Sequence, residues 1–142
     1  MITRAETQHI LALTNLWERA VRKTHTFLSK EEIQRLRASV HDTWLAALPV
    51  WVWQDESGVC KGFIGVLDKK IEMLFVDPDA SGCGIGKALL TFACEQHGAC
   101  LVDVNEQNPA AVAFYEHMGF TREGRSPRDG DGKPYPLLHM RR

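Results

Sequence analysis

The order of the elements that the sequence predicts indicates an α/β (α+β) fold in one domain spanning residues 1–142. Apolar residues recur every three or four positions in four segments, which is typical of amphipathic helices. Short runs rich in Val, Ile, Trp and Phe lie between these segments and are typical of strands. The predicted order is one strand, two helices, three strands, a helix, a strand, a helix and two strands.

The N-terminal third is expected to be mainly helical. A short strand at residues 2–4 precedes a helix that begins near Gln8. A second helix follows Ser29, which is a favourable N-cap, and Glu32 three residues later predicts a reciprocal capping box. The apolar positions of this helix continue at helical spacing until Pro49, so we expect one uninterrupted helix that ends there.

The other elements follow from periodicity and turn residues. Gly98 ends the third helix, Pro109 begins the fourth and Gly119 closes it. An Asp- and Gly-rich turn at residues 129–134 joins the last two strands as a hairpin. Six further strands are expected, at residues 51–53, 61–66, 70–76, 100–105, 121–126 and 135–140.

A glycine-rich loop is the most informative segment of the chain. It reads Ser81-Gly82-Cys83-Gly84-Ile85-Gly86-Lys87 and lies between an apolar strand and an amphipathic helix. Glycine lets the backbone approach a ligand closely and adopt positive φ. The free N–H groups and the dipole of the following helix favour an anion, most often a phosphate. The loop therefore predicts a pyrophosphate-binding site.

Two common phosphate-binding motifs do not fit this loop. A P-loop places Gly five residues before Gly-Lys-Ser/Thr, but Ser81 stands there and Ala88 follows the lysine. A dinucleotide fingerprint requires a third glycine, and the two possible positions hold Lys87 and Leu89. A nucleotide-binding regulator is therefore disfavoured, although a glycine-rich helix start without a ligand stays open.

A second motif lies downstream. The segment from Asn108 to Phe120 reads Asn-Pro-Ala-Ala-Val-Ala-Phe-Tyr-Glu-His-Met-Gly-Phe. It resembles the Asn-x-x-Ala-x-x-Phe-Tyr-x-x-x-Gly-Phe block of the GNAT superfamily of N-acetyltransferases. The glycine loop, after a strand that ends in Val-x-Pro, is similar to that family's Arg/Gln-x-x-Gly-x-Gly/Ala loop. The two motifs occur in the family's order, and the likeness is sharp over residues 71–120.

The resemblance implies a fold and an activity. The fold is a mixed, mostly antiparallel sheet of about seven strands with four helices. The activity is transfer of an acetyl group from acetyl-CoA to a primary amine by direct attack in a ternary complex, in a small, single-domain bacterial member of the family. The alternative is a non-catalytic module that binds CoA as a regulatory ligand.

The resemblance also implies roles for particular residues. The main chain of Leu74 and Val76 would bind the pantetheine arm, Asn108 would bond the same arm, and Tyr115 would protonate the departing thiolate. The residues alone favour two simpler roles equally. Asn108 would be only the N-cap of the following helix, and Tyr115 would be a core residue. The pyrophosphate would be held by the loop residues Gly82, Cys83, Gly84, Gly86 and Lys87.

One position of the loop departs from the family pattern. Ser81 stands where the family carries Arg or Gln. Because backbone N–H groups bind the phosphates, we expect the site to persist with altered affinity. Lys87 is a candidate source of positive charge, or else a solvated helix residue. Cys83 lies at a helix N-terminus, where the pKa of a thiol falls, which makes it a candidate redox-sensitive group and not a nucleophile.

The general base has two candidates. Glu72 precedes the loop and alternates with Ile71 and Met73, so it is expected to face the acceptor cleft, or to be a solvated strand residue. His25 lies between the first two helices, where the family forms its acceptor pocket, and can relay a proton or cap a helix. Bulk water acting through bound waters is a third possibility.

Composition sets the broad class. The formal net charge is −1, which gives no field that recruits nucleic acid or an acidic membrane. The four cysteines have no metal-ligand spacing, so we expect no metal and reduced thiols in the cytoplasm. No signal peptide is recognised. Partners are expected to be acetyl-CoA and an amine acceptor, a protein lysine, an N-terminus or a small amine, in a monomer or homodimer.

Overall fold

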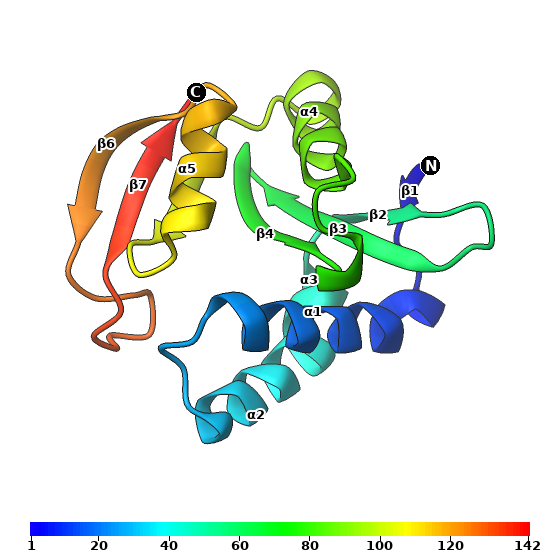
Figure 1. Ribbon diagram of the computed structural model, residues 1–142, viewed down its shortest axis with the longest axis horizontal. Helices are drawn as coiled ribbons and strands as arrows, with labels where there is room; N and C mark the ends of the chain where they lie inside the picture. Colours follow the sequence, from blue (N-terminus) through cyan, green and yellow to red (C-terminus); the bar gives the residue numbers. More distant parts are fainter.

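The fold is built on one seven-stranded sheet. The computed structural model describes all 142 residues, and its strands follow the order β1-β2-β3-β4-β5-β7-β6 (Figure 1). Neighbouring strands pair antiparallel except β4 and β5, which are parallel. This confirms the predicted fold class. The strands are β1 (Ile2–Arg4), β2 (Val50–Gln54), β3 (Cys60–Leu67), β4 (Lys70–Val76), β5 (Leu101–Asn105), β6 (Thr121–Ser126) and β7 (Leu137–Arg141).

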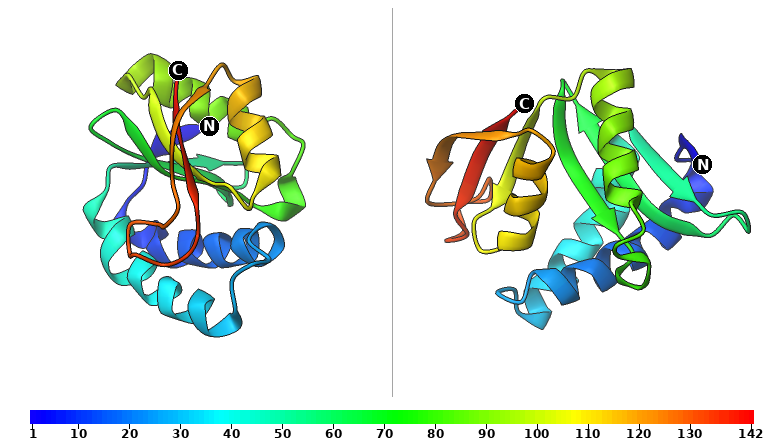
Figure 2. Two further views of the ribbon diagram at one scale, coloured as in Figure 1. Left: turned by 90° about the vertical axis from the view of Figure 1, so that its left-hand side faces the viewer. Right: turned by 45° about the horizontal axis from the view of Figure 1, so that its top comes forward.

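Helices cover the two faces of the sheet unequally. Helices α1 (Ile10–Thr24) and α2 (Lys30–Ser39) pack under β2–β4, while α4 (Ile85–His97) lies on the opposite face (Figures 1 and 2). Helix α5 (Pro109–His117) packs against β5 on the side of α4. Two hydrophobic cores result, one between the sheet and α1/α2 and the other between the sheet and α4/α5.

The sheet divides between β4 and β5. These strands pair only at Lys70–Leu101 and Ile71–Val102, at their beginnings. Beyond these two pairs, the facing edges of both strands carry backbone groups without a ladder partner, and the strands diverge (Figure 1). The division of the sheet therefore exposes main-chain donors and acceptors inside the fold.

A bulge re-aims the side chains of β4. Ile71 pairs with Val66 and Met73 with Gly65, so Glu72 has no partner on β3. The extra residue puts Ile71 in the α4/α5 core and Met73 in the α1/α2 core, on opposite faces. The simple alternation expected around Glu72 is therefore wrong. After the bulge, Leu74 and Val76 point towards α4 and α5.

The second predicted helix runs to Ala47, just before Pro49 as predicted, but it contains a π-helical turn. Helix α2 gives way to a π-helical turn at Val40–Trp44 and then to the short α3 (Leu45–Ala47). The turn contains His, Asp and Thr, which are weaker helix formers than Ala or Leu. Half of the capping box forms, because Ser29 Oγ accepts from the Glu32 N–H at 3.1 Å while the Glu32 carboxylate binds Arg35.

The last strand begins later than predicted. The sequence predicts a strand from residue 135, but β7 begins at Leu137. Pro134 and Pro136 flank Tyr135 and supply no N–H to a ladder, so Tyr135 stays in the loop. Its ring packs on Phe27 with the ring centres 5.4 Å apart, which brings the loop between β6 and β7 to the end of α1.

Candidate active site

The glycine loop leads directly from β4 into α4. The buried carboxylate of Asp77 accepts the Asp79 N–H at 3.0 Å and so starts the short turn Pro78–Ala80. Gly82 (φ 83°) and Gly84 (φ 79°) then adopt left-handed backbone conformations that favour glycine. Gly84 is the N-cap of α4 and has no capping side chain. The first N–H groups of α4 are therefore left free for an anion.

A cavity of about 370 Å³ lies beside this loop. It brings the loop glycines together with the end of β4 and with α5, and Gly86, Ser81 and Phe114 complete its wall. We call it the loop cavity. Cys83 is exposed on the loop and is not among its lining residues. Seven predicted site residues line it: Leu74, Val76, Gly82, Gly84, Gly86, Lys87 and Tyr115.

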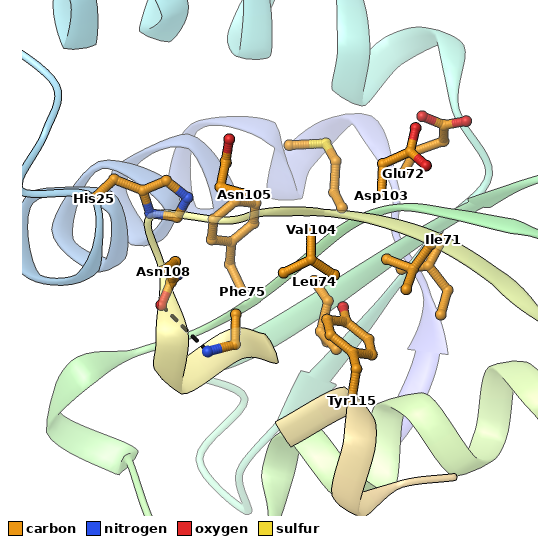
Figure 3. A pocket seen from close by; sticks show the side chains of 13 residues that line it. His25, Ile71, Glu72, Leu74, Phe75, Asp103, Val104, Asn105, Asn108 and Tyr115 are labelled. Carbon is orange, nitrogen blue, oxygen red and sulfur yellow. Dashed lines mark hydrogen bonds between the residues drawn. The ribbon is translucent and has the colours of Figure 1, made fainter. Parts of the chain in front are cut away.

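A second cavity, of about 160 Å³, opens where β4 and β5 part (Figure 3). We call it the split cavity. It shares Leu74, Ala111 and Tyr115 with the loop cavity, so the two are adjacent. In the view of Figure 3, Tyr115 rises from α5 below the strands, whereas His25, Asn105, Asp103 and Glu72 lie above them. The cavity brings together the three predicted catalytic residues and their neighbours: His25, Glu72, Asp103, Asn105, Asn108 and Tyr115.

Tyr115 combines a buried ring with a free hydroxyl. Its ring packs edge-on against Phe114 and Phe120, with ring centres 5.2 and 5.4 Å away. No protein group hydrogen-bonds the hydroxyl, yet the oxygen is not sealed from the cavity. Burial raises the pKa of the phenol far above its ordinary value of 10.0. Tyr115 therefore holds its proton at neutral pH and can donate it into the cavity.

His25 closes α1 and presents one bare nitrogen. Its Nδ1 lies 2.8 Å from Thr24 Oγ1, whose single proton is donated to the Ala20 carbonyl. The hydroxyl therefore accepts from Nδ1–H, which leaves Nε2 as an acceptor. Burial lowers the pKa of His25 from 6.5 to about 4, so the imidazole is neutral at physiological pH. The ring packs at a tilt against Phe27 and Phe75, with ring centres 5.4 and 6.3 Å away.

The sequence did not predict the network of hydrogen-bonded side chains that begins at Asp103. This carboxylate binds Lys70 Nζ and His139 Nδ1, each at 2.7 Å, and His139 Nε2 lies 2.7 Å from Ser126 Oγ. Partial burial raises the pKa of Asp103, but the two hydrogen bonds outweigh it and hold the pKa below its usual value. This network links β4, β5, β7 and β6 beside the split between β4 and β5.

Only part of this hydrogen-bonded network faces the active site. Asp103 lines the split cavity, whereas His139 and Ser126 do not. The alternation of Asp103 and Asn105 with buried Val102 and Val104 was the available signal. It identifies two polar groups on one face of β5, but it does not reveal that β4 separates from that strand.

Asn108 is an N-cap, as predicted, and keeps a free side-chain nitrogen. It is buried at the start of α5, and its Oδ1 accepts the Ala111 N–H at 3.2 Å as an N-cap. Its side-chain nitrogen donates to no protein group and is not sealed off, so it is free to bond a ligand in the split cavity.

Comparison with known proteins identifies the family. The acetyltransferase (GNAT) domain family matches residues 47–122. The chain belongs to the GNAT acetyltransferase family. YjaB of Escherichia coli (strain K12), a peptidyl-lysine N-acetyltransferase, is 41% identical over 128 residues, which cover 90% of this chain and 86% of that protein. YiaC, another peptidyl-lysine N-acetyltransferase of that strain, is 31% identical over 121 residues, covering 84% and 82%.

The fold comparison agrees with this membership. The solution structure of apo-form YjaB from Escherichia coli superposes with a TM-score of 0.91 at 38% identity, covering 99% of this chain and 95% of that one. The predicted family is thus confirmed, and this GNAT protein is an acetyl-CoA-dependent N-acetyltransferase. The non-catalytic alternative finds no support among these relatives. No helix of this GNAT protein is long and apolar enough to cross a membrane.

Proposed function

We propose that this GNAT protein acetylates the side-chain amine of lysine in proteins or peptides. The observation that carries the proposal is a row of three neighbouring cavities at the β4–β5 split. The split cavity shares lining residues with the loop cavity and also with a third cavity of about 140 Å³ beside α1 and α2. Donor and acceptor would therefore meet from opposite ends of this row, next to Tyr115.

The donor side is suited to acetyl-CoA. The loop N–H groups after Gly82 and Gly84 would bind the pyrophosphate, with Lys87 contributing positive charge. The unpaired edge of β4 at Leu74 and Val76 would hold the pantetheine arm by its main chain, together with the free side-chain nitrogen of Asn108. The thioester would then lie at the split, within reach of the Tyr115 hydroxyl.

The third cavity is suited to a lysine side chain. We call it the acceptor cavity, and it shares His25, Phe75 and Asn105 with the split cavity. Phe27, Trp44 and Tyr135 give it aromatic walls, which suit an aliphatic stem and a cation. Glu32, Arg35 and Asp129 also line it, and because Glu32 is paired with Arg35 at 3.0 Å, Asp129 leaves the cavity wall with net negative charge. The peptidyl-lysine activity of YjaB and YiaC supports the same acceptor.

The reaction needs three proton movements. Glu72, exposed on the bulge of β4, would accept the proton that the ammonium must lose before attack. The bare Nε2 of neutral His25 would accept a hydrogen bond from the amine and orient it, since a pKa of about 4 makes it a weak base. The amide bond forms as the thioester C–S bond breaks, and Tyr115 would give its proton to the departing thiolate of CoA. The attacking nitrogen then loses its second proton, which restores the phenol of Tyr115.

Three further properties belong to the same proposal. The enzyme would need no metal ion, it would act in the cytoplasm, and it would be a monomer or homodimer. All four cysteines are unpaired, which agrees with a reducing compartment.

The experiment that tests the acceptor uses acetyl-CoA with three amines. One peptide carries a single lysine and a blocked N-terminus, a second carries a free N-terminus and no lysine, and the third amine is spermidine. We expect turnover with the lysine peptide to exceed both others by at least about tenfold, because only it offers a neutral stem ending in one cation. Preferential acetylation of the free N-terminus or of spermidine would overturn the lysine proposal.

A further inference from the structure

A groove runs between α1 and the end of β4, next to the glycine loop. Its volume is about 290 Å³, and it shares Leu74, Val76, Ser81 and Ala111 with the loop cavity, so the two adjoin at the end of β4. The residues that line it from α1 and the loop region are Ala20, Lys23, Thr24, Pro78, Ser81 and Asn108. Lys23 thus lines the same groove as Ser81, which stands where the family loop carries Arg or Gln.

An ion pair holds α1 in this place. Arg19 Nη2 lies 2.8 Å from Asp77 Oδ2, and Asp77 is the buried residue that starts the turn into the loop. Lys23 follows Arg19 by four residues, so both lie on one face of α1, one turn apart. Helix α1 is therefore fixed to the base of the loop, with Lys23 beside it.

Lys23 is the one basic residue of α1 that has no carboxylate partner. Arg19 is paired with Asp77, and Arg22 is paired with Glu18 at 3.0 Å. Lys23 is exposed and makes neither an ion pair nor a side-chain hydrogen bond. A cation without a partner, in a groove that reaches the glycine loop at Ser81, adds to the attraction of that loop for an anion.

We propose that Lys23 binds the pyrophosphate of acetyl-CoA and replaces the charge that the family loop carries at the position of Ser81. This inference rests on the proposed placement of the cofactor at the glycine loop. The ammonium would approach from α1, across the groove from the loop, whereas the family's Arg or Gln approaches from within the loop. The site would thus keep its charge although the loop has lost it.

The first test measures CoA binding by calorimetry at low salt. Lys23→Met keeps the length of the side chain and removes its charge, and we expect the dissociation constant to rise about tenfold. Lys30→Met is the matched control, because Lys30 is also exposed and makes no ion pair, and we expect no change. Equal affinities for Lys23→Met and the unaltered protein would overturn the proposal.

Truncated ligands identify the phosphate. The Lys23→Met loss should be the same for CoA and for 3′-dephospho-CoA, because both carry the pyrophosphate, and it should vanish for pantetheine. A loss confined to CoA would overturn the pyrophosphate assignment, since it would place the lysine on the 3′-phosphate. A loss that persists with pantetheine would overturn it as well, by showing an effect unrelated to phosphate.

Rescue by Ser81→Arg provides the sharpest test. In the Lys23→Met background it should restore most of the lost affinity, whereas in the unaltered protein it should improve affinity only slightly. Additive effects of the two substitutions would show that the side chains do not serve one phosphate. If instead Gly84→Val bound CoA normally, the placement of the cofactor itself would be wrong, and the two failures are thereby distinguished.

Discussion

The two faces of the active site are built in different ways. On the donor face, a continuous segment from Val76 to Lys87 supplies the proposed contacts, mostly through backbone N–H groups. On the acceptor face, side chains meet from the end of α1, the start of α2, β5 and the loop before β7. Backbone chemistry is common to every member of a family, whereas side chains are free to vary. The donor face therefore suits a shared cosubstrate, and the acceptor face suits a substrate particular to this chain.

The largest expected effect breaks the donor face. In Gly84→Val, the branched side chain must adopt φ near 79°, so the loop N–H groups lose their alignment. Hydrogen bonds to charged groups contribute about 1.5–3 kcal/mol each, so losing two of them weakens CoA about a hundredfold or more. Calorimetry with CoA measures the loss.

Gly58→Val is the matched control for this prediction. Gly58 has φ 81° in the hairpin between β2 and β3, and, as at Gly84, nothing lies within 4 Å of an added Cβ. Both variants carry the same backbone strain, so both should melt at a lower temperature. Only Gly84→Val should lose CoA. Equal loss of CoA in both would attribute the effect to general destabilisation and not to the loop.

The second effect separates chemistry from binding at the junction of the two faces. Tyr115→Phe should lower kcat by about 10²–10⁴-fold, the usual contribution of a general acid. CoA affinity and melting temperature should stay unchanged, because the hydroxyl bonds no protein group. Tyr135→Phe removes the only other phenol of the chain, on the acceptor face, and should leave kcat within about twofold. Unchanged kcat in Tyr115→Phe would remove its proposed catalytic role.

The donor face could be predicted from the sequence more fully than the acceptor face. The glycine loop, Asn108 and Tyr115 lie in two short motifs, and local spacing was sufficient to select them. Asp103 and the Phe27–Tyr135 contact depend on where β4 leaves β5 and on how the two prolines shorten β7. These are properties of long-range pairing, to which residue patterns are nearly blind. The bulge at Glu72 was missed for the same reason, because an extra residue in one strand is defined only by its partner strand.

The third effect concerns the acidity of the acceptor face. The pKa of His25 is about 4 when folded and near 6.5 when unfolded, so below pH 6.5 the unfolded chain binds more protons. As far as His25 is concerned, the free energy of unfolding is therefore highest above pH 6.5. It decreases by up to about 3 kcal/mol as the pH falls towards 4. Denaturant unfolding between pH 7 and pH 4 measures this, and His25→Gln should flatten the curve over that range. A curve of equal slope in His25→Gln would show that other groups cause the loss.

The same neutral imidazole makes a prediction about catalysis. Because His25 does not titrate between pH 6 and pH 9, its removal should leave the midpoint of the pH–rate profile in place while lowering the rate. A midpoint that moves in His25→Gln would instead make His25 the group that accepts the proton. Glu72→Gln is the companion variant, and it should depress the rate at every pH at which the carboxylate would have been ionised.

The smallest expected effect sharpens the acceptor face. Glu32 lines the acceptor cavity, whereas its neighbour Glu31 is exposed on α2 and lines none of the three cavities. Glu32→Gln should raise KM for the lysine peptide about twofold to threefold, because it removes a negative charge and leaves the Arg35 guanidinium on the cavity wall without its partner. The effect is small because partly solvated charges act only weakly on a cation. Glu31→Gln removes the same charge and should change nothing, and KM for acetyl-CoA should stay constant in both. The difference should also fade as salt is added, since screening removes long-range attraction first. Equal KM values for the two variants at low salt would show that Glu32 does not contribute to binding the incoming lysine, and would leave the aromatic walls as the source of acceptor recognition.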